Sequence, residues 1–482
     1  MEPVFPFDLD LRGDGPLSRE LHERLRAAIL DGRLAAGAAL PSSRDAARAL
    51  GIARNTVVAA YDLLVAEGYA IPRRGAKALI AGIAARPART GRPTNAAPAT
   101  PVRPLWNLPS MQPEPPRELP ARSFRLGVPD HRQFPHATWR RLHARALRTW
   151  SRDGFSYPPT AGIPALREAI AKHAAFARAV ACTAGDIVVT SGAQQAVDLI
   201  ARLLVVPGQT CVALEEPGYP PMRATFAAAG AKLAGVPVDD EGLCVDRLPA
   251  DARVIVVTPS HQSPTGAALS MRRRLELLAF ARRHGAVVVE DDYDGEFRFG
   301  GRPLDALQTL DRDARVFYVG TFTKSLFPAL RKGFVVAPRW ARDPLVAVKH
   351  ATDSHGDAIT QSALAAFIAE GHLARHVRRM RTVYAARREA LLAGLRGSLA
   401  EWLEPIPSEA GLHLAARIRD PRRAEAVIAS LRRHAPGAQS IAEYATRPLE
   451  RPAVAFGYGV IDAEAIPPAL ASLRRALARM GR

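Results

Sequence analysis

Hydrophobic residues in the first part of the chain recur with the period of an α-helix. Between Leu21 and Ile29 the apolar positions fall on one helical face, and Asp31-Gly32 follows as a typical helix end. We therefore expect a first helix over about residues 17–30. This helix opens a compact N-terminal domain.

Two more helices and a hairpin are expected in the same domain. Ser42 or Ser43 is a suitable N-cap for a second helix, and a third helix begins near Arg54. Two short helices joined by a glycine-containing turn are typical of the helix-turn-helix, whose second helix enters the major groove of DNA. Residues 69–80 predict a β-hairpin with a basic tip. Residues 14–80 are therefore expected to form an α+β winged helix-turn-helix.

The composition of the chain changes at residues 81–122, which are rich in proline and arginine. We expect an extended linker there, because proline interrupts regular elements. From 123 to 482, helical stretches alternate with short apolar runs. This alternation indicates an α/β domain with a mostly parallel sheet that is buried on both faces. The runs are 187–190, 210–214, 254–258, 286–290 and 316–319.

Composition narrows the classes of function. The 482 residues carry a formal net charge of +19, which favours polyanionic partners, although an arginine-rich proteome would give the same skew. Three scattered cysteines indicate a reducing cytoplasm, with neither disulfides nor a zinc site. The N-terminus lacks the pattern of a signal peptide, and no uncharged run of about 18 apolar residues could span a membrane. We therefore expect a cytoplasmic protein without a metal site.

The strongest chemical signal follows the last apolar run. Thr321 and Thr323 bring hydroxyls, Lys324 brings an amine and Arg331 a guanidinium, in a chain that is otherwise poor in lysine. An amine can form a Schiff base with an aldehyde, and hydroxyls together with a guanidinium can hold a phosphate. One ligand, pyridoxal 5′-phosphate (PLP), meets both needs. The alternative is a solvated lysine in a polar turn.

Residues suited to the same ligand follow other apolar runs, and ligands of parallel sheets bind beyond the carboxyl ends of the strands. A small-residue turn at Gly192 opens a helix and could hold a phosphate through its backbone. Tyr219 could stack on a flat ring, and Asp291 could keep a pyridine nitrogen protonated. Each signal is weak alone. Together, and in this order, they favour PLP.

Three strings in the N-terminal domain carry a family resemblance: AILDGRL at 28–34, LPSSR at 40–44 and LGIARNTV at 50–57. Through them, residues 17–80 resemble the GntR family of bacterial repressors. The resemblance implies that Arg44 and Arg54 contact phosphates or base edges of DNA. The further DNA-contacting residues that it implies are Asn55 and Thr56 at the start of the recognition helix, and Arg73, Arg74 and Gly75 in the wing.

From about 120 to 480, the strand-end residues resemble those of fold-type I PLP enzymes of the aspartate aminotransferase class, and the whole chain resembles the MocR-type regulators. This resemblance implies a smaller C-terminal α/β subdomain and a homodimer, domain-swapped head-to-tail. It implies an aldimine at Lys324 and an effector carboxylate at Arg451. The cofactor ligands that it implies are Lys324, Arg331, Thr321, Thr323, Gly192, Ala193, Gln194, Tyr219, Asp291, Tyr293, Ser263 and, across the dimer interface, Tyr157.

Two functions of different classes fit this organisation. The first is a regulator that binds operator DNA and whose PLP-binding domain senses PLP, an amine or an amino acid. The second is an active aminotransferase that carries a DNA-binding head. Ser263 replaces the asparagine that aminotransferases keep near the ring 3′-oxygen, which favours the regulator, with at most weak transamination. Pro221 stands where the GABA-responsive branch has a second arginine, so a GABA response is not expected. A body without cofactor, serving only as a dimer scaffold, would lack a visible aldimine band.

Overall fold

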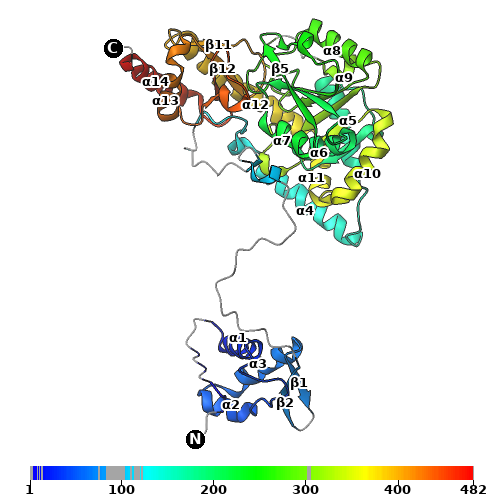
Figure 1. Cartoon of the computed structure of the whole chain (residues 1–482), viewed down its shortest axis with the longest axis vertical. Helices are drawn as coiled ribbons and strands as arrows, with labels where there is room; N and C mark the ends of the chain where they lie inside the picture. Colours follow the sequence, from blue (N-terminus) through cyan, green and yellow to red (C-terminus); the bar gives the residue numbers. More distant parts are fainter. Residues whose placement is uncertain are drawn as a thin grey trace. The chain divides into compact units, whose positions relative to one another are not determined.

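A computed structural model describes residues 4–7, 9, 11, 15–73, 76–82, 104–108, 111–112, 120, 123–300 and 305–480 of the chain (Figure 1). The chain divides into two compact units, Met1–Val102 and Arg103–Arg482. The wing-tip residues Arg74 and Gly75 lie outside the described residues.

The first unit has the expected order of elements, and Ser42 is the N-cap of its second helix, accepting a hydrogen bond from the Asp45 amide. Gly51 ends that helix with a φ of 66°, a left-handed conformation that favours glycine. Phe5 is buried in the same core as the helices. The elements are α1 (Leu17–Leu30), α2 (Ser43–Leu50), α3 (Arg54–Ala66) and the antiparallel pair β1 (Ala70–Arg73) and β2 (Ala76–Ile80).

In the second unit, eight of the described strands form one sheet in the order β3-β10-β9-β8-β7-β4-β5-β6. The five apolar runs of the sequence are its strands β3, β4, β7, β8 and β9. The last four of these, together with β5, are parallel, whereas β10 runs antiparallel between β3 and β9. The strands are β3 (Ile187–Thr190), β4 (Cys211–Glu216), β5 (Lys232–Asp239), β6 (Gly242–Leu243), β7 (Ala252–Val257), β8 (Val287–Asp292), β9 (Val316–Thr321) and β10 (Gly333–Val336).

Helices cover both faces of this sheet (Figure 1), which explains why its strands are continuously apolar. On β7, for example, Val254 and Val256 pack into one hydrophobic cluster, and Ile255 and Val257 pack into another. The helices are α4 (His136–Arg152), α5 (Pro164–Arg178), α6 (Ala193–Leu204), α7 (Pro220–Ala228), α8 (Met271–His284), α9 (Leu307–Leu310), α10 (Arg342–Asp353) and α11 (Ala358–Ala369).

The C-terminal part forms a smaller subdomain around an antiparallel sheet of order β11-β12-β14-β13. The segment before α4 runs beside this sheet, since the Gly457 amide donates to the Phe124 carbonyl at 3.0 Å. The same segment carries Gly127, whose carbonyl accepts a hydrogen bond from Lys324, three residues beyond β9. The elements are α12 (His372–Arg396), β11 (Leu403–Pro405), β12 (His413–Ile418), α13 (Ala424–His434), β13 (Gln439–Ser440), β14 (Ala453–Gly457) and α14 (Ile466–Met480).

The expected fold class is confirmed: an α+β winged helix-turn-helix precedes an α/β domain with a mostly parallel sheet and a smaller C-terminal subdomain. In the part of the chain that the structure describes, none of the helices is both long and apolar enough to cross a membrane.

Candidate cofactor and effector site

A cavity of about 320 Å³ lies at the carboxyl ends of the large sheet, closed on one side by the small subdomain. Most of the cofactor ligands expected from the sequence line it, although they come from segments more than a hundred residues apart. They are Ala193, Gln194, Tyr219, Ser263, Asp291, Tyr293, Thr321, Thr323, Lys324 and Arg331. The remaining lining residues are Leu126, Gly127, Met222, His413, Gln439 and Tyr444.

Lys324 lies three residues beyond the end of β9 and points its amine into this cavity. Its Nζ donates a 2.6 Å hydrogen bond to the backbone carbonyl of Gly127. Burial lowers the pKa of Lys324, although the carboxylates of Asp294 and Asp291 oppose the shift. The amine is therefore more often neutral, and more nucleophilic, than an exposed lysine.

A cradle suited to a phosphate lies beside the amine. Gly192 is the N-cap of α6 with a φ of 86°, and a Cβ at this position would lie only 3.2 Å from the guanidinium carbon of Arg331. Only glycine lets the chain turn there and lets the guanidinium approach so closely. The backbone amides that open α6 and the hydroxyls of Thr321 and Thr323, which lie 2.8 Å apart, complete a set of donors for an anion.

The cavity also offers the Asp291 carboxyl as an acceptor for the N–H of a bound ring. The side chain is at the end of β8, 5% exposed, and its Oδ1 has no hydrogen-bond partner among the described residues. Burial, and secondly the charge of Asp292, raise the pKa of Asp291 to about 8. A pyridinium N–H would supply the missing donor and hold the carboxylate in its charged form. The residues present therefore fit PLP.

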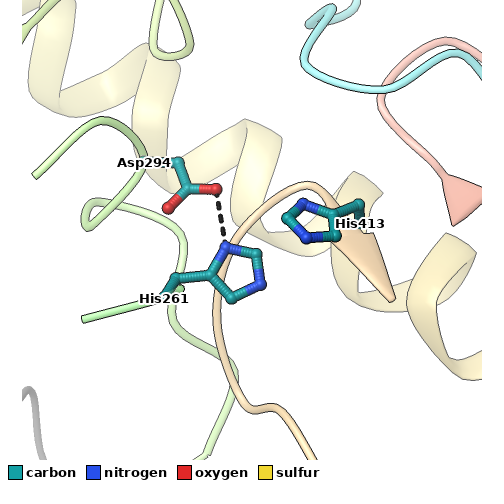
Figure 2. A group of neighbouring side chains, drawn as sticks. All are labelled: His261, Asp294 and His413. Atoms are coloured by element: carbon teal, nitrogen blue, oxygen red, sulfur yellow. Dashed lines mark hydrogen bonds and ion pairs between the residues drawn. The ribbon is translucent and has the colours of Figure 1, made fainter. Parts of the chain in front are cut away.

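Three buried side chains, His261, Asp294 and His413, lie next to one another (Figure 2), and His261 also contacts Tyr293 of the cavity wall. The Nδ1 of His261 donates to Asp294 Oδ2 at 3.0 Å and lies equally far from the Tyr293 hydroxyl. The centroids of the His413 and His261 rings lie 4.4 Å apart. The Nε2 of His413 donates to the Pro264 carbonyl at 3.0 Å. One possible ligand atom of each of the three residues lies within 4.8 Å of the others, as in a metal site. Each of the three side chains forms a hydrogen bond, although His261 Nε2 has no partner among the described residues, and we interpret the group as support for the wall.

Arg451, expected at this site, lies elsewhere, and Tyr157, expected to act across a dimer interface, lies on the surface of its own chain. The Tyr157 side chain is 88% exposed, and the centroid of its ring lies 5.6 Å from the centroid of the His355 ring. Arg451 lies 3.7 Å from Glu404 with its side chain 63% exposed, and it lines a separate cavity together with Arg417. The structure thus does not bring Arg451 to the cavity of Lys324.

Several residues of the cavity wall were not expected from the sequence. Gly127 precedes Lys324 by 197 residues, and His413, Gln439 and Tyr444 come from the small subdomain. None of these residues stands in a recognisable motif. No local signal could have found them, because only the packing of the subdomain on the large sheet brings them to the cavity.

In the first unit, the residues expected to contact DNA lie at the start of two helices. Arg44 is exposed in the first turn of α2, and Arg54 and Asn55 are exposed in the first turn of α3, with Thr56 half-buried beside them. The Arg54 Nε donates to the Ser43 hydroxyl at 3.2 Å, which links the two helix starts. A further residue of the expected set, Arg73, is exposed at the end of β1.

Comparison with known proteins agrees with both units. Residues 17–80 match the family described as bacterial regulatory proteins of the gntR family, and residues 126–436 match aminotransferase class I and II. The "Probable rhizopine catabolism regulatory protein MocR" of Rhizobium meliloti is 42% identical over 413 residues, which cover 85% of this chain and 83% of the relative. The pyridoxine biosynthesis regulator PdxR of Corynebacterium glutamicum is 30% identical, over 98% of each chain.

Among solved structures, the α-aminoadipate aminotransferase LysN of Thermus thermophilus is 28% identical with a TM-score of 0.67, over 74% of this chain and 92% of that one. That enzyme was crystallised with N-(5′-phosphopyridoxyl)-L-leucine. The aminotransferase fold is therefore present, whereas the relatives that share both units are regulators. The chain belongs to the MocR-type transcriptional regulators, in which a GntR-family DNA-binding domain is joined to an aminotransferase-like domain.

Proposed function

We propose that this regulator binds PLP in the cavity of Lys324 and uses the loaded cavity to sense a small amine. The observation that carries the proposal is the meeting, in one cavity, of the Lys324 amine, the Asp291 carboxyl, whose Oδ1 has no hydrogen-bond partner among the described residues, and the Arg331 guanidinium, which lies against Gly192. When bound, PLP supplies an aldehyde carbon that amines attack.

Different residues of the chain bind different parts of the cofactor. Lys324 is its covalent anchor, and Arg331 with the α6 amides and the Thr321 and Thr323 hydroxyls bind its phosphate. Asp291 orients the ring through its nitrogen, and Tyr219 stacks on the ring. Tyr293, whose hydroxyl lies 3.0 Å from His261 Nδ1, would donate to the ring 3′-oxygen, and Ser263 also lines the cavity.

Regulation, with at most weak transamination, is the proposed output. Ser263 is a shorter donor than the asparagine of aminotransferases, so the ring 3′-oxygen loses part of its support. Ligand binding at Lys324 is coupled to DNA binding because the ligand favours one of two packings of the protein. The protein acts where the chromosome is, in the cytoplasm.

Two surfaces complete the proposal. The first turns of α2 and α3, with Arg44, Arg54 and Asn55, contact operator DNA, and the arginines neutralise phosphates. The exposed aromatic side chains of Tyr157 and Phe155, 88% and 57% exposed, are covered by a second copy of the chain in a homodimer. In that dimer Tyr157 serves the partner's cofactor phosphate.

Visible absorption spectroscopy tests the proposed anchor. Protein loaded with PLP should show the absorption band of a lysine-bound cofactor, and Lys324→Ala should remove it. The matched control is Lys172→Ala, which changes a lysine on α5, outside the cavity, and should leave the band intact. Wild-type protein without the band, or Lys324→Ala with it, would contradict the assignment.

A further inference from the structure

We propose that the cavity of Lys324 selects primary amines whose remaining part is uncharged and carries hydroxyls, in preference to amino acids. The inference rests on the proposed binding of PLP and names the class of effector. It follows from the distribution of charge around the cavity.

The cationic side chains among the described lining residues are both assigned to the cofactor. Arg331 lies against the Gly192 turn, in the cradle for the phosphate, and Lys324 is the anchor. An effector carboxylate in the remaining space therefore meets no guanidinium or ammonium from the described part of this chain. A carboxylate taken out of water without a cationic partner is strongly disfavoured.

The arginines near the cavity are held by other groups. Arg223 reaches toward the Tyr444 segment, but its Nη2 lies 3.3 Å from the Glu216 carboxylate and 3.1 Å from the Tyr444 carbonyl. Arg447 donates to the Gly235 carbonyl at 2.9 Å. Arg451 lies beside Glu404 in the separate cavity. To bind an effector carboxylate, Arg223 would have to leave an acid that already neutralises it.

Two buried acids also make this part of the cavity unfavourable for a ligand carboxylate. Asp291 lines it, and Asp294 lies directly behind it, hydrogen bonded to His261. Both acids attract the Lys324 ammonium. Neither acid offers a ligand carboxylate a cationic partner, and the charge of an ionised acid repels it.

The part of the cavity wall formed by Ser263, His413, Gln439 and Tyr444 is neutral and forms hydrogen bonds. The Tyr444 hydroxyl donates to Gln439 Oε1 at 2.6 Å, which orients the amide so that its nitrogen is a donor for a ligand oxygen. His413 adds a neutral ring, since burial lowers its pKa well below the ordinary value. Ser263 adds a hydroxyl. Such a wall pairs with hydroxyls of a ligand.

Matched pairs of probes test the inference. PLP-loaded protein is titrated with 4-amino-1-butanol and with 4-aminobutyrate, and in parallel with serinol and with serine, while the visible band is followed. Each amino alcohol should perturb the band at a concentration about ten-fold or more below that of its amino acid, a difference of about 1.4 kcal/mol. Equal or tighter response to the amino acids, including one caused by a guanidinium from a second copy, would overturn the inference.

A variant tests the same point by adding charge to the wall. Gln439→Arg should shift the ratio of the two dissociation constants by about ten-fold toward the amino acid. Gln133→Arg, at an exposed position outside the cavity, adds the same charge and should leave the ratio unchanged. The wild-type comparison remains decisive if Gln439→Arg does not fold. Absence of the band before any titration would instead overturn the proposed PLP binding, and this inference with it.

Discussion

The Lys324 amine donates a 2.6 Å hydrogen bond to the backbone carbonyl of Gly127, a residue 197 positions earlier in the chain. The segment that carries Gly127 is held against the small subdomain, and Lys324 stands beyond the end of β9 in the large sheet. The hydrogen bond thus couples the proposed cofactor anchor to the contact between the two parts of the aminotransferase-like domain.

Gly127→Ala should weaken PLP binding. Gly127 has a φ of 71°, and an added Cβ would lie 2.9 Å from the Lys324 Nζ, so the amine has to move. We expect a loss of about ten-fold in affinity, measured by titrating the visible band with PLP. Gly154→Ala is the matched control, because Gly154 has a φ of 72° and a Cβ there would meet no atom within 4 Å. Similar losses in both variants would show that backbone strain alone is responsible.

Asp291→Asn should change how the cofactor-free protein responds to pH. The pKa of Asp291 is raised to about 8 by burial, above that of an unfolded aspartate, so the folded state binds the extra proton. The free energy of unfolding therefore contains a contribution that is complete below about pH 4 and is lost as pH rises toward 8. Between pH 5 and 8 the melting temperature of the wild type should fall relative to that of the variant.

Glu215 and Glu290, whose pKa values burial raises to about 7, are present in both proteins, so the comparison removes the slope that the two proteins share. Parallel melting curves across the range would contradict the assignment of a protonated Asp291. The same variant should bind PLP more weakly, because an amide accepts the pyridinium N–H without the charge.

Asp130→Asn should destabilise the domain at neutral pH. Asp130 is 2% exposed, and the guanidiniums of Arg132 and Arg387 lie 2.8 Å and 2.6 Å from its Oδ2. Burial raises the pKa of Asp130, but the hydrogen bonds from Arg132 and Arg387 outweigh it and lower the pKa to about 2. This depressed pKa contributes about 2 kcal/mol above pH 4 that is lost as pH falls toward 2.

The difference between wild type and Asp130→Asn, measured by urea unfolding, should accordingly be about 2–4 kcal/mol at pH 7 and shrink below pH 4. A matched control is Asp198→Asn, where the carboxylate forms an exposed pair with Arg202 on α6 and its loss should cost less than about 1 kcal/mol. A pH-independent difference would mean that the Asp130 cluster is not ionised as described.

Arg54→Ala should weaken DNA binding by about ten-fold or more and reduce the dependence of the affinity on salt. Arg54 is exposed in the first turn of α3 and is oriented by the Ser43 hydroxyl. The probe is a duplex selected from a random pool by the wild-type protein, and the measurement is fluorescence anisotropy at several salt concentrations. Arg24→Ala, exposed on α1, is the control with equal charge. Equal affinities of Arg54→Ala and wild type would place the recognition surface elsewhere.

The sequence by itself determined the elements and the chemistry of the anchor. The helical period predicted α1 and α3, continuous apolar runs predicted the strand that carries Asp291 and the strand that precedes Lys324, and Ser42 or Ser43 marked the start of α2. The sequence pattern did not predict strands β5 and β10. The exposed positions of β5 interrupt its apolar pattern, and β10 is four residues long beside Arg331 and Lys332. These signals are local, since they depend on backbone period and on neighbouring side chains.

Only the tertiary structure decided how the site is completed. It set Gly127 against Lys324, brought Gln439 and Tyr444 to the wall of the same cavity, and placed Arg451 beside Glu404 outside the cavity. These contacts join residues far apart in the chain, and they depend on how the small subdomain packs against the large sheet. The charge that an effector meets is the sum over all of these segments, which no single stretch of sequence contains.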